Sequence, residues 1–157
     1  MKNETKRRIR LISWILFVMY ILLLVYFLFL SEEYGRQSYQ VREYRYNLVF
    51  FREIHRFLTY WEMVGFWSAM LNICGNIIGF IPFGFFLPIL QPRCKRVWVV
   101  VLSGMLVSLL VESIQLISKV GCFDVDDIFL NTLGVLIGVL WFCICNWLRR
   151  LLYEKKI

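Results

Sequence analysis

Residues 97–117 of this 157-residue chain are VWVVVLSGMLVSLLVESIQLI, an apolar run that contains a single charged side chain, Glu112. An α-helix needs about 20 mostly apolar residues to cross the hydrocarbon layer of a bilayer. The run has that length. It therefore predicts a membrane-spanning helix that carries one carboxylate near its end.

Three further stretches have the same character, at about residues 11–30, 69–90 and 128–148. The whole chain is 60% hydrophobic, whereas soluble domains are about 45–50% apolar. We expect an all-α fold: a polytopic membrane protein whose single domain, residues 1–157, is a bundle of four transmembrane helices. The first apolar run is too long for the core of a cleaved signal peptide and is expected to stay as a span. The prolines of the second span are expected to bend that helix without breaking it.

The distribution of basic residues predicts how the spans are oriented. Short segments rich in Lys and Arg stay on the cytoplasmic side of a membrane. Twelve of the 18 Lys and Arg residues flank one side of the predicted spans at short range. Both termini are therefore expected in the cytoplasm, with the protein in the cytoplasmic membrane. The twelve are Lys2, Lys6, Arg7, Arg8, Arg10, Arg93, Lys95, Arg96, Arg149, Arg150, Lys155 and Lys156.

The long loop between the first two spans, residues 31–68, mixes aromatic side chains with Arg and Glu. Two interpretations remain open. The loop can contain an interfacial helix that lies among lipid headgroups, or it can cap the helix bundle. The aromatic residues in question are Phe50, Phe51, Phe57, Tyr60, Trp61, Phe66 and Trp67.

Polar residues are expected to converge at the outer ends of the second, third and fourth spans. Glu112 and Gln115 are three residues apart, and Asp127 and Asn131 are four apart, so each pair shares a helix face. A buried ionisable residue in a span is costly and is therefore a candidate functional residue. We call the following set the polar cluster: Asn72, Asn76, Glu112, Gln115, Asp124, Asp126, Asp127 and Asn131.

No Lys or Arg lies inside a predicted span to neutralise these carboxylates, which indicates that an external cation or a basic ligand group completes the site. A divalent cation is one candidate, with Asp124, Asp126 and Asp127 as oxygen ligands. Two structural alternatives remain open. Glu112 can join helices by bonding to asparagines, and Asp126 or Asp127 can cap the fourth helix.

Small residues predict where helices approach closely. The pattern Asn-x-x-Gly-x-x-x-Gly occurs at residues 72–79 and again at 131–138. Glycines four residues apart allow helix backbones to come together in membranes. Close contacts are therefore expected on both of these helix faces.

Three ordered motifs resemble the VanZ-like family. They are Asn76 to Phe85 (NIIGFIPFGF), Glu112 to Gln115 (ESIQ) and Gly121 to Gly134 (GCFDVDDIFLNTLG), and the resemblance covers about residues 47–138. Residues 47–51 (NLVFF) lack the proline that members often have there. The resemblance implies a membrane location and a link to surface-acting antibiotics, because the namesake of the family is associated with teicoplanin resistance in Gram-positive bacteria. It implies no particular reaction.

Three functions follow as hypotheses. The first is an accessory membrane protein that changes how the cell surface handles a lipid-linked or lipid-anchored molecule, and so contributes to resistance against lipoglycopeptides. The second is a metal-dependent enzyme that acts on a lipid-phosphate headgroup, with Glu112 as base. The chain has one histidine, His55, and no serine or cysteine paired with a base, so catalytic residues stay unassigned and a non-enzyme is favoured. The third is a small transporter or flippase subunit, which would need to form a homo-oligomer.

The expected partners are membrane lipids, and no nucleic acid is expected, since the basic residues flank apolar runs.

Overall fold

The computed structural model describes residues 3–30, 44–91 and 96–154. Four long helices dominate these residues, and each is apolar enough and long enough to cross a membrane. The elements are α1 (Asn3–Val25), the π-helix η1 (Tyr26–Leu30), β1 (Arg45–Asn47), α2 (Arg52–Thr59), α3 (Trp61–Val64), α4 (Phe66–Leu90), α5 (Val97–Ile117), β2 (Cys122–Asp124) and α6 (Val125–Glu154). The expected all-α membrane fold is confirmed.

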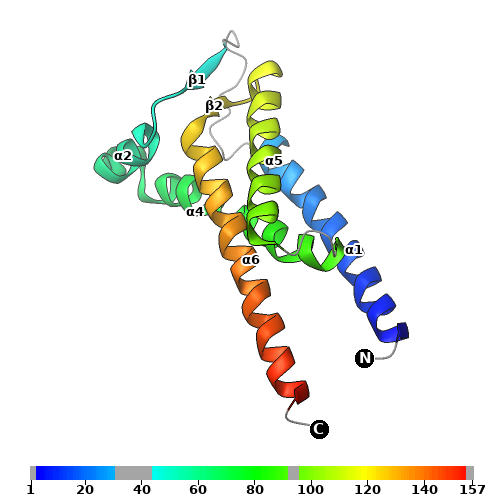
Figure 1. The fold of residues 1–157 in the computed structure, drawn as a ribbon. Coiled ribbons are helices and arrows are strands. Elements are labelled where there is room, and N and C mark those ends of the chain that lie inside the picture. Colours follow the sequence, from blue (N-terminus) through cyan, green and yellow to red (C-terminus); the bar gives the residue numbers. More distant parts are fainter. Residues whose placement is uncertain (1–2, 31–43, 92–95, 155–157) are drawn as a thin grey trace.

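The four long helices alternate in direction, so the start of α1 and the end of α6 lie at one end of the bundle (Figure 1). The two short strands lie at the opposite end, which we call the distal end (Figure 1). The third span was predicted at 97–117, which is where α5 lies, and α4 continues through Pro82 and Pro88 without a break. Helix α6 is longer than predicted and begins at Val125.

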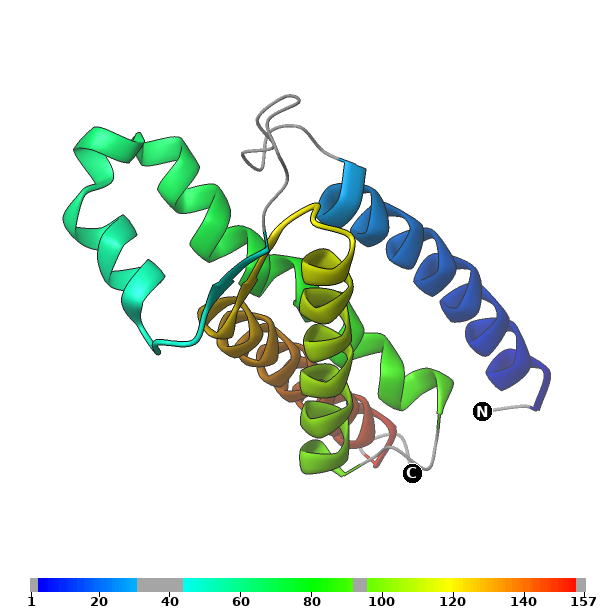
Figure 2. The ribbon, with the colours of Figure 1, turned by 90° about the horizontal axis from the view of Figure 1, so that it is seen from above.

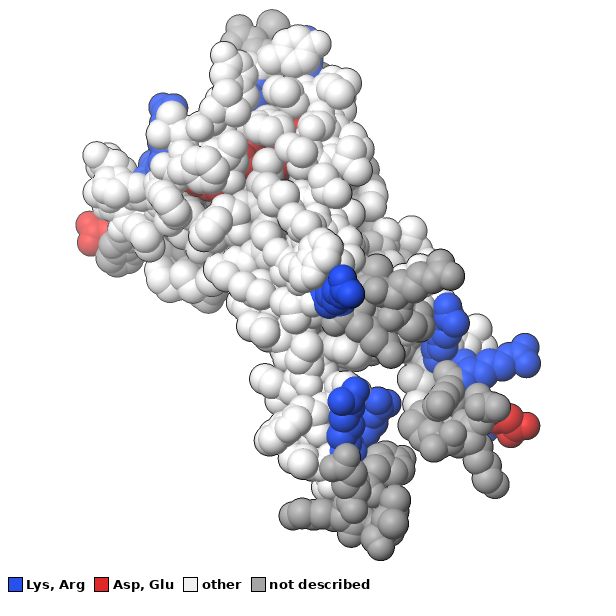
Figure 3. Space-filling view, in the orientation of Figure 1, with Lys and Arg blue, Asp and Glu red and all other residues white. Residues whose placement is uncertain are grey.

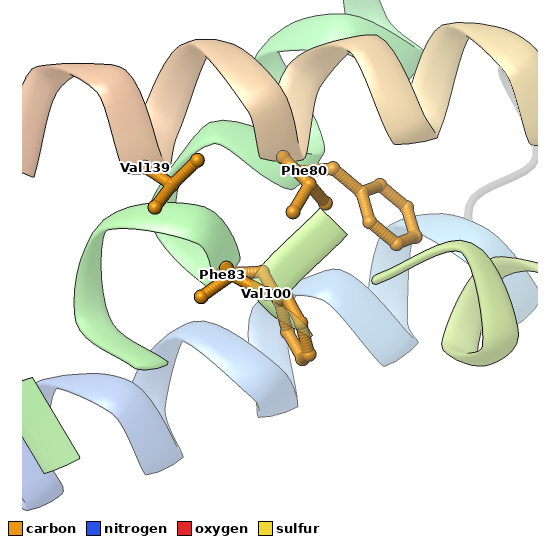
Figure 4. Packing of buried hydrophobic residues seen from close by; sticks show 5 residues of the cluster. Phe80, Phe83, Val100 and Val139 are labelled. Carbon is orange, nitrogen blue, oxygen red and sulfur yellow. The ribbon is translucent and has the colours of Figure 1, made fainter. Parts of the chain in front are cut away.

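The core lies between α4, α5 and α6, where valine and phenylalanine side chains interlock (Figure 4). Helices α4 and α6 touch at the backbone. A Cβ on Gly134 would collide with the carbonyl of Ile77, and one on Gly138 would collide with that of Ile81. Glycine at these positions therefore permits a contact that any side chain would prevent. The core residues are Phe80, Phe83, Val100, Val135 and Val139.

The prediction for the glycines is only half right. Gly134 and Gly138 make the close contact on α6, but Gly79 of α4 faces Leu24 of α1 at ordinary van der Waals distance. On α4, the glycine in close contact with α6 is Gly84. A Cβ added at Gly84 would collide with the carbonyl of Val135. Helix α1 packs at the edge of the bundle, where the Tyr20 hydroxyl donates to the Gly79 carbonyl at 2.9 Å.

The strands were not predicted. β1 and β2 pair in parallel, with Arg45 opposite Cys122 and Asn47 opposite Asp124. A parallel pair needs a long connection between its strands, and here α2 to α5 supply it. This pairing fixes the described end of the long loop to the turn that leads into α6, at the distal end (Figure 2).

Candidate functional site

The buried face of α5 carries the first half of the polar cluster. Val100, Gly104, Ser108 and Glu112 are the buried residues of this helix and lie at intervals of four. This spacing places them in one stripe along the helix. The carboxylate of Glu112 is only 2% exposed and points into the bundle.

The start of α6 carries the second half. The Oδ1 atom of Asp127 accepts a hydrogen bond from Asn76 Nδ2 of α4 at 2.6 Å. One turn further along, Asn131 Nδ2 donates to the Ser108 hydroxyl of α5 at 2.8 Å. Asn131 is fully buried, and its Oδ1 has no hydrogen-bond partner among the described residues. Helices α4, α5 and α6 are thus joined by polar side chains at the distal end.

One structural alternative was that Glu112 bonds to asparagines. Among the described residues it forms no such bond. Its Oε2 accepts the backbone N–H of Asp124 at 3.1 Å, which ties α5 to the start of α6. The charge of Asp127, in the first turn of α6, is among those that act on Glu112. Within the described residues, neither group forms an ion pair with Lys or Arg, and the one ion pair there joins Arg56 to Glu53.

Asp124 caps α6, so the expectation that Asp126 or Asp127 would do so is wrong. Its Oδ1 accepts the backbone N–H of Asp126 at 2.8 Å, the bond of a residue that immediately precedes a helix. The same oxygen accepts Asn47 Nδ2 at 3.1 Å. Asp124 is buried, and this burial, more than any other cause, raises its pKa.

Asp126 caps a different helix, α2 in the long loop. Its Oδ2 accepts the backbone N–H of Glu53 at 2.9 Å and that of Ile54 at 3.3 Å. Its Oδ1 accepts the N–H of Phe51. These amides at a helix start have no partner within the helix, and a carboxylate satisfies them well. Asp126 therefore holds the loop to α6.

Two predicted residues lie away from the centre of the cluster. Gln115 turns toward η1, where its Nε2 donates to the Leu28 carbonyl at 3.0 Å. This hydrogen bond joins α5 to η1. Asn72 is half-buried on α4 and makes no side-chain hydrogen bond with any described residue.

The structure adds two residues that the predicted set lacked. Asn47 is 5% exposed and bonds to Asp124, and Ser108 is fully buried and bonds to Asn131. Signals for both were present in the sequence. Asn47 begins the stretch that resembles the family motif without its proline, and Ser108 lies in the stripe with Glu112.

Asp124, Asp126 and Asp127 are the carboxylates expected as ligands of a divalent cation. Among the residues that the structure describes, no three His, Cys, Asp or Glu side chains form a group that could hold a metal. Both oxygens of Asp126 and one of Asp124 accept the hydrogen bonds described above. The described cysteines, Cys74, Cys122, Cys143 and Cys145, are free thiols, and Cys94 lies outside the described residues.

The family model described as VanZ/LLP1 matches residues 17–146, which include every residue of the polar cluster. No curated protein and no solved structure matches the chain.

Proposed function

The chain belongs to the VanZ/LLP1 family, and from this premise we propose that it is an accessory protein of the cytoplasmic membrane. In this proposal the polar cluster faces outward and changes how the cell surface handles a lipid-linked or lipid-anchored molecule. The expected consequence is lower sensitivity to lipoglycopeptides of the teicoplanin type. The association of the family's namesake with teicoplanin resistance supports the choice of drug class.

The observation that carries the proposal is the pair of carboxyl groups of Glu112 and Asp127. Glu112 lies on α5 and Asp127 in the first turn of α6, where the charge of Asp127 acts on Glu112, and neither forms an ion pair with a described Lys or Arg. Burying like charges without a counter-charge is costly. A cation or a basic group of a ligand would relieve this cost. Such a ligand is therefore the chemistry that we propose for the site.

The proposed orientation rests on the positive charges of the flanks. Exposed arginines gather at the end where α1 begins and α6 ends (Figure 3). Short basic flanks stay in the cytoplasm, which would place the distal end outside. Lys2, Arg93, Lys95, Lys155 and Lys156 contribute to the same argument from sequence alone, because they lie outside the described residues. A fluorescent protein fused to the C-terminus should fluoresce, and an alkaline phosphatase fusion there should be inactive; the reverse pattern would contradict the orientation.

The test of function compares charge-deleting variants in a teicoplanin-susceptible Gram-positive host. Expression of the wild-type chain should raise the minimal inhibitory concentration of teicoplanin. Glu112→Gln should lose most of this protection at equal membrane abundance, because Gln keeps an oxygen acceptor for the Asp124 N–H but carries no charge. Asp127→Asn should behave alike, and the double variant should lose little more, as expected for two residues that act together.

The matched control is Glu62→Gln, which deletes an exposed carboxylate on α3 outside the cluster and should leave protection unchanged. If the wild-type chain gives no protection, the resistance role is wrong. If Glu112→Gln protects as well as the wild type, the carboxylate is only a structural link between helices.

A divalent cation remains the alternative ligand of the cluster. Both oxygens of Asp126 accept hydrogen bonds and Asp124 accepts two, whereas Glu112 and Asp127 each accept one. We therefore propose that such an ion would bind at Glu112 and Asp127 through their other oxygens. Titration of the purified protein with Mn²⁺, followed by electron paramagnetic resonance, would detect it. Loss of the bound signal in Asp127→Asn is the expected result, and an unchanged signal would assign the ion elsewhere.

A further inference from the structure

Large apolar side chains are exposed along a surface that lies outside the four candidate spans. Met63 of α3 is 84% exposed, Trp67 at the start of α4 is 76% exposed and Leu58 of α2 is 67% exposed. Tyr60, between α2 and α3, is also exposed. The nearest candidate span begins at Met70. We call Leu58, Tyr60, Met63 and Trp67 the junction surface.

Apolar exposure on this scale needs a partner. Side chains on the spans are exposed in the isolated chain because lipid hydrocarbon covers them in a membrane. The junction surface lies before the span, so this explanation does not cover it directly. Contiguous exposed apolar side chains mark a contact with another protein, a ligand or a membrane.

The junction surface is a fixed part of the fold. Asp126 caps α2 by accepting the N–H groups of Glu53 and Ile54, and Phe57 of α2 is buried. The ring of Phe51 packs edge-on against Phe129 of α6, with 5.6 Å between centroids. These contacts hold α2 beside the first turns of α6 (Figures 1 and 2). These contacts with α6 therefore fix the position of the junction surface along the axis of the bundle.

The junction surface lies directly before the candidate span of α4. Trp67 precedes Met70 by three residues of the same helix, which is about 4.5 Å at the helical rise. Met70 and Leu71 are exposed and lie three and four residues after Trp67 on α4, so they continue the same helix face into the candidate span. Trp and Tyr are the side chains that gather at headgroup level, where one part of the ring is apolar and the other polar.

The helix α2 also has two distinct exposed sides. Leu58 and Arg56 are both exposed, and they point about 160° away from each other, given 3.6 residues per turn. Arg52 and Thr59 are exposed on the same polar side as Arg56. A helix with one apolar and one charged exposed side, held parallel to a membrane surface, matches an interfacial helix.

We propose that the junction surface lies on the lipid leaflet at the distal end, with Leu58, Met63 and Trp67 in the boundary between headgroups and acyl chains. Helices α2 and α3 then anchor the distal end to the bilayer, while Arg52 and Thr59 face water. The occupant is lipid because the surface is continuous with the membrane-facing side of α4. The proposal does not depend on the proposed function or on which side of the membrane the distal end faces.

The test measures the depth of single spin labels in the full-length chain. The five native cysteines are replaced by alanine, and one cysteine is placed at Leu58, Met63 or Trp67 and labelled with a nitroxide in nanodiscs of phosphatidylcholine and phosphatidylglycerol. Oxygen partitions into acyl chains, whereas a nickel chelate stays in water. Labels at the three positions should relax several-fold more strongly with oxygen than with the chelate. Matched labels at Arg52 and Thr59 should show the reverse.

Two results would overturn the proposal. Equal access of the nickel chelate to Met63→Cys and Arg52→Cys would place the surface in water. Protection of the three positions from both reagents would mean that a protein covers it.

A second measurement uses the unmodified chain, in case labelled variants fold poorly. A polar oxidant should convert Met63 to its sulfoxide several-fold more slowly in nanodiscs than in the unfolded chain. Equal rates would contradict lipid burial.

Discussion

The carboxylate of Asp126, in the first turn of α6, accepts the backbone N–H of Phe51, which lies 75 residues earlier in the chain. Phe51 has a φ of 62°, in the left-handed region that bulky residues rarely adopt. The same carboxylate accepts the N–H groups of Glu53 and Ile54. One buried side chain thus stabilises the turn before α2 and fixes the start of that helix.

Asp126→Ala should release α2 from the bundle. The substitution leaves three backbone N–H groups without their acceptor, and we expect it to cost roughly 1–3 kcal/mol. Hydrogen exchange should become faster across residues 51–60, with little change in α5. Glu62→Ala removes an exposed carboxylate nearby and is the control. Unchanged exchange in α2 would show that Phe57 and Phe129 hold the helix without Asp126.

Gly134→Ala should weaken the contact between α4 and α6. The new methyl group would collide with the Ile77 carbonyl, which is part of a helix backbone and cannot move freely. Overpacking of this kind costs about 1–3 kcal/mol, and the thermal unfolding midpoint in detergent should fall. Gly79→Ala is the matched control, because its methyl group would lie 3.6 Å from Leu24. Equal midpoints for the two variants would contradict the close contact.

Hydropathy alone located the spans well because the signal is local. Each span is a run of about 20 apolar residues, and the limits of α5 follow directly from Arg96 and from the polar residues after Ile117. The start of α6 was missed by three residues for a physical reason. Asp124 caps the helix, so Val125, Asp126 and Asp127 already belong to its first turn.

The convergence of the polar cluster could be predicted only in part. Spacing along the helices was enough to place Glu112 on the buried face of α5 and Asp127 on a side of α6 that meets α4. The partners of Asp126 could not be inferred, since its acceptor role depends on amides more than 70 residues away. The pairing of β1 with β2 was missed for the same reason, because three-residue strands leave no periodicity to detect.

The hydrogen bond between Ser108 and Asn131 gives a prediction about buried polar groups. Ser108→Ala should destabilise the protein, because it leaves both ends of the Asn131 amide without a partner. The expected cost is about 0.6–2 kcal/mol. The double variant Ser108→Ala/Asn131→Leu should recover part of this loss, since no polar group then remains unpaired.

The control is Ser113→Ala on the same helix, whose hydroxyl bonds only to the Leu109 carbonyl of its own helix. Ser113→Ala should change the midpoint of thermal unfolding very little. A double variant less stable than Ser108→Ala would mean that the Asn131 amide has a favourable partner of its own, such as a bound water molecule.

The free energy of unfolding should depend on pH, because folding raises the pKa of Asp124. Burial is the main cause that raises the pKa of Asp124, and the negative charges of Asp126 and Glu53 act in the same direction. The hydrogen bonds from the Asp126 N–H and from Asn47 oppose them. A carboxyl group whose pKa is raised by folding binds a proton more readily in the folded state. Its stabilising contribution is therefore complete below the unfolded pKa, about 3.9 for Asp, and is lost as the pH rises through the folded pKa.

Asp124→Asn isolates this effect, because the amide oxygen still accepts the Asp126 N–H and carries no charge. Thermal unfolding of both proteins should be followed from about pH 4, near the unfolded pKa, to neutrality. The midpoint of Asp124→Asn relative to the wild type should rise with pH, because only the wild type must bury a charge there. Glu62→Gln, at an exposed carboxylate, should show no such trend. If the wild type gains on Asp124→Asn as the pH rises, the ionised carboxylate stabilises the fold, and the cap and the Asn47 bond outweigh burial.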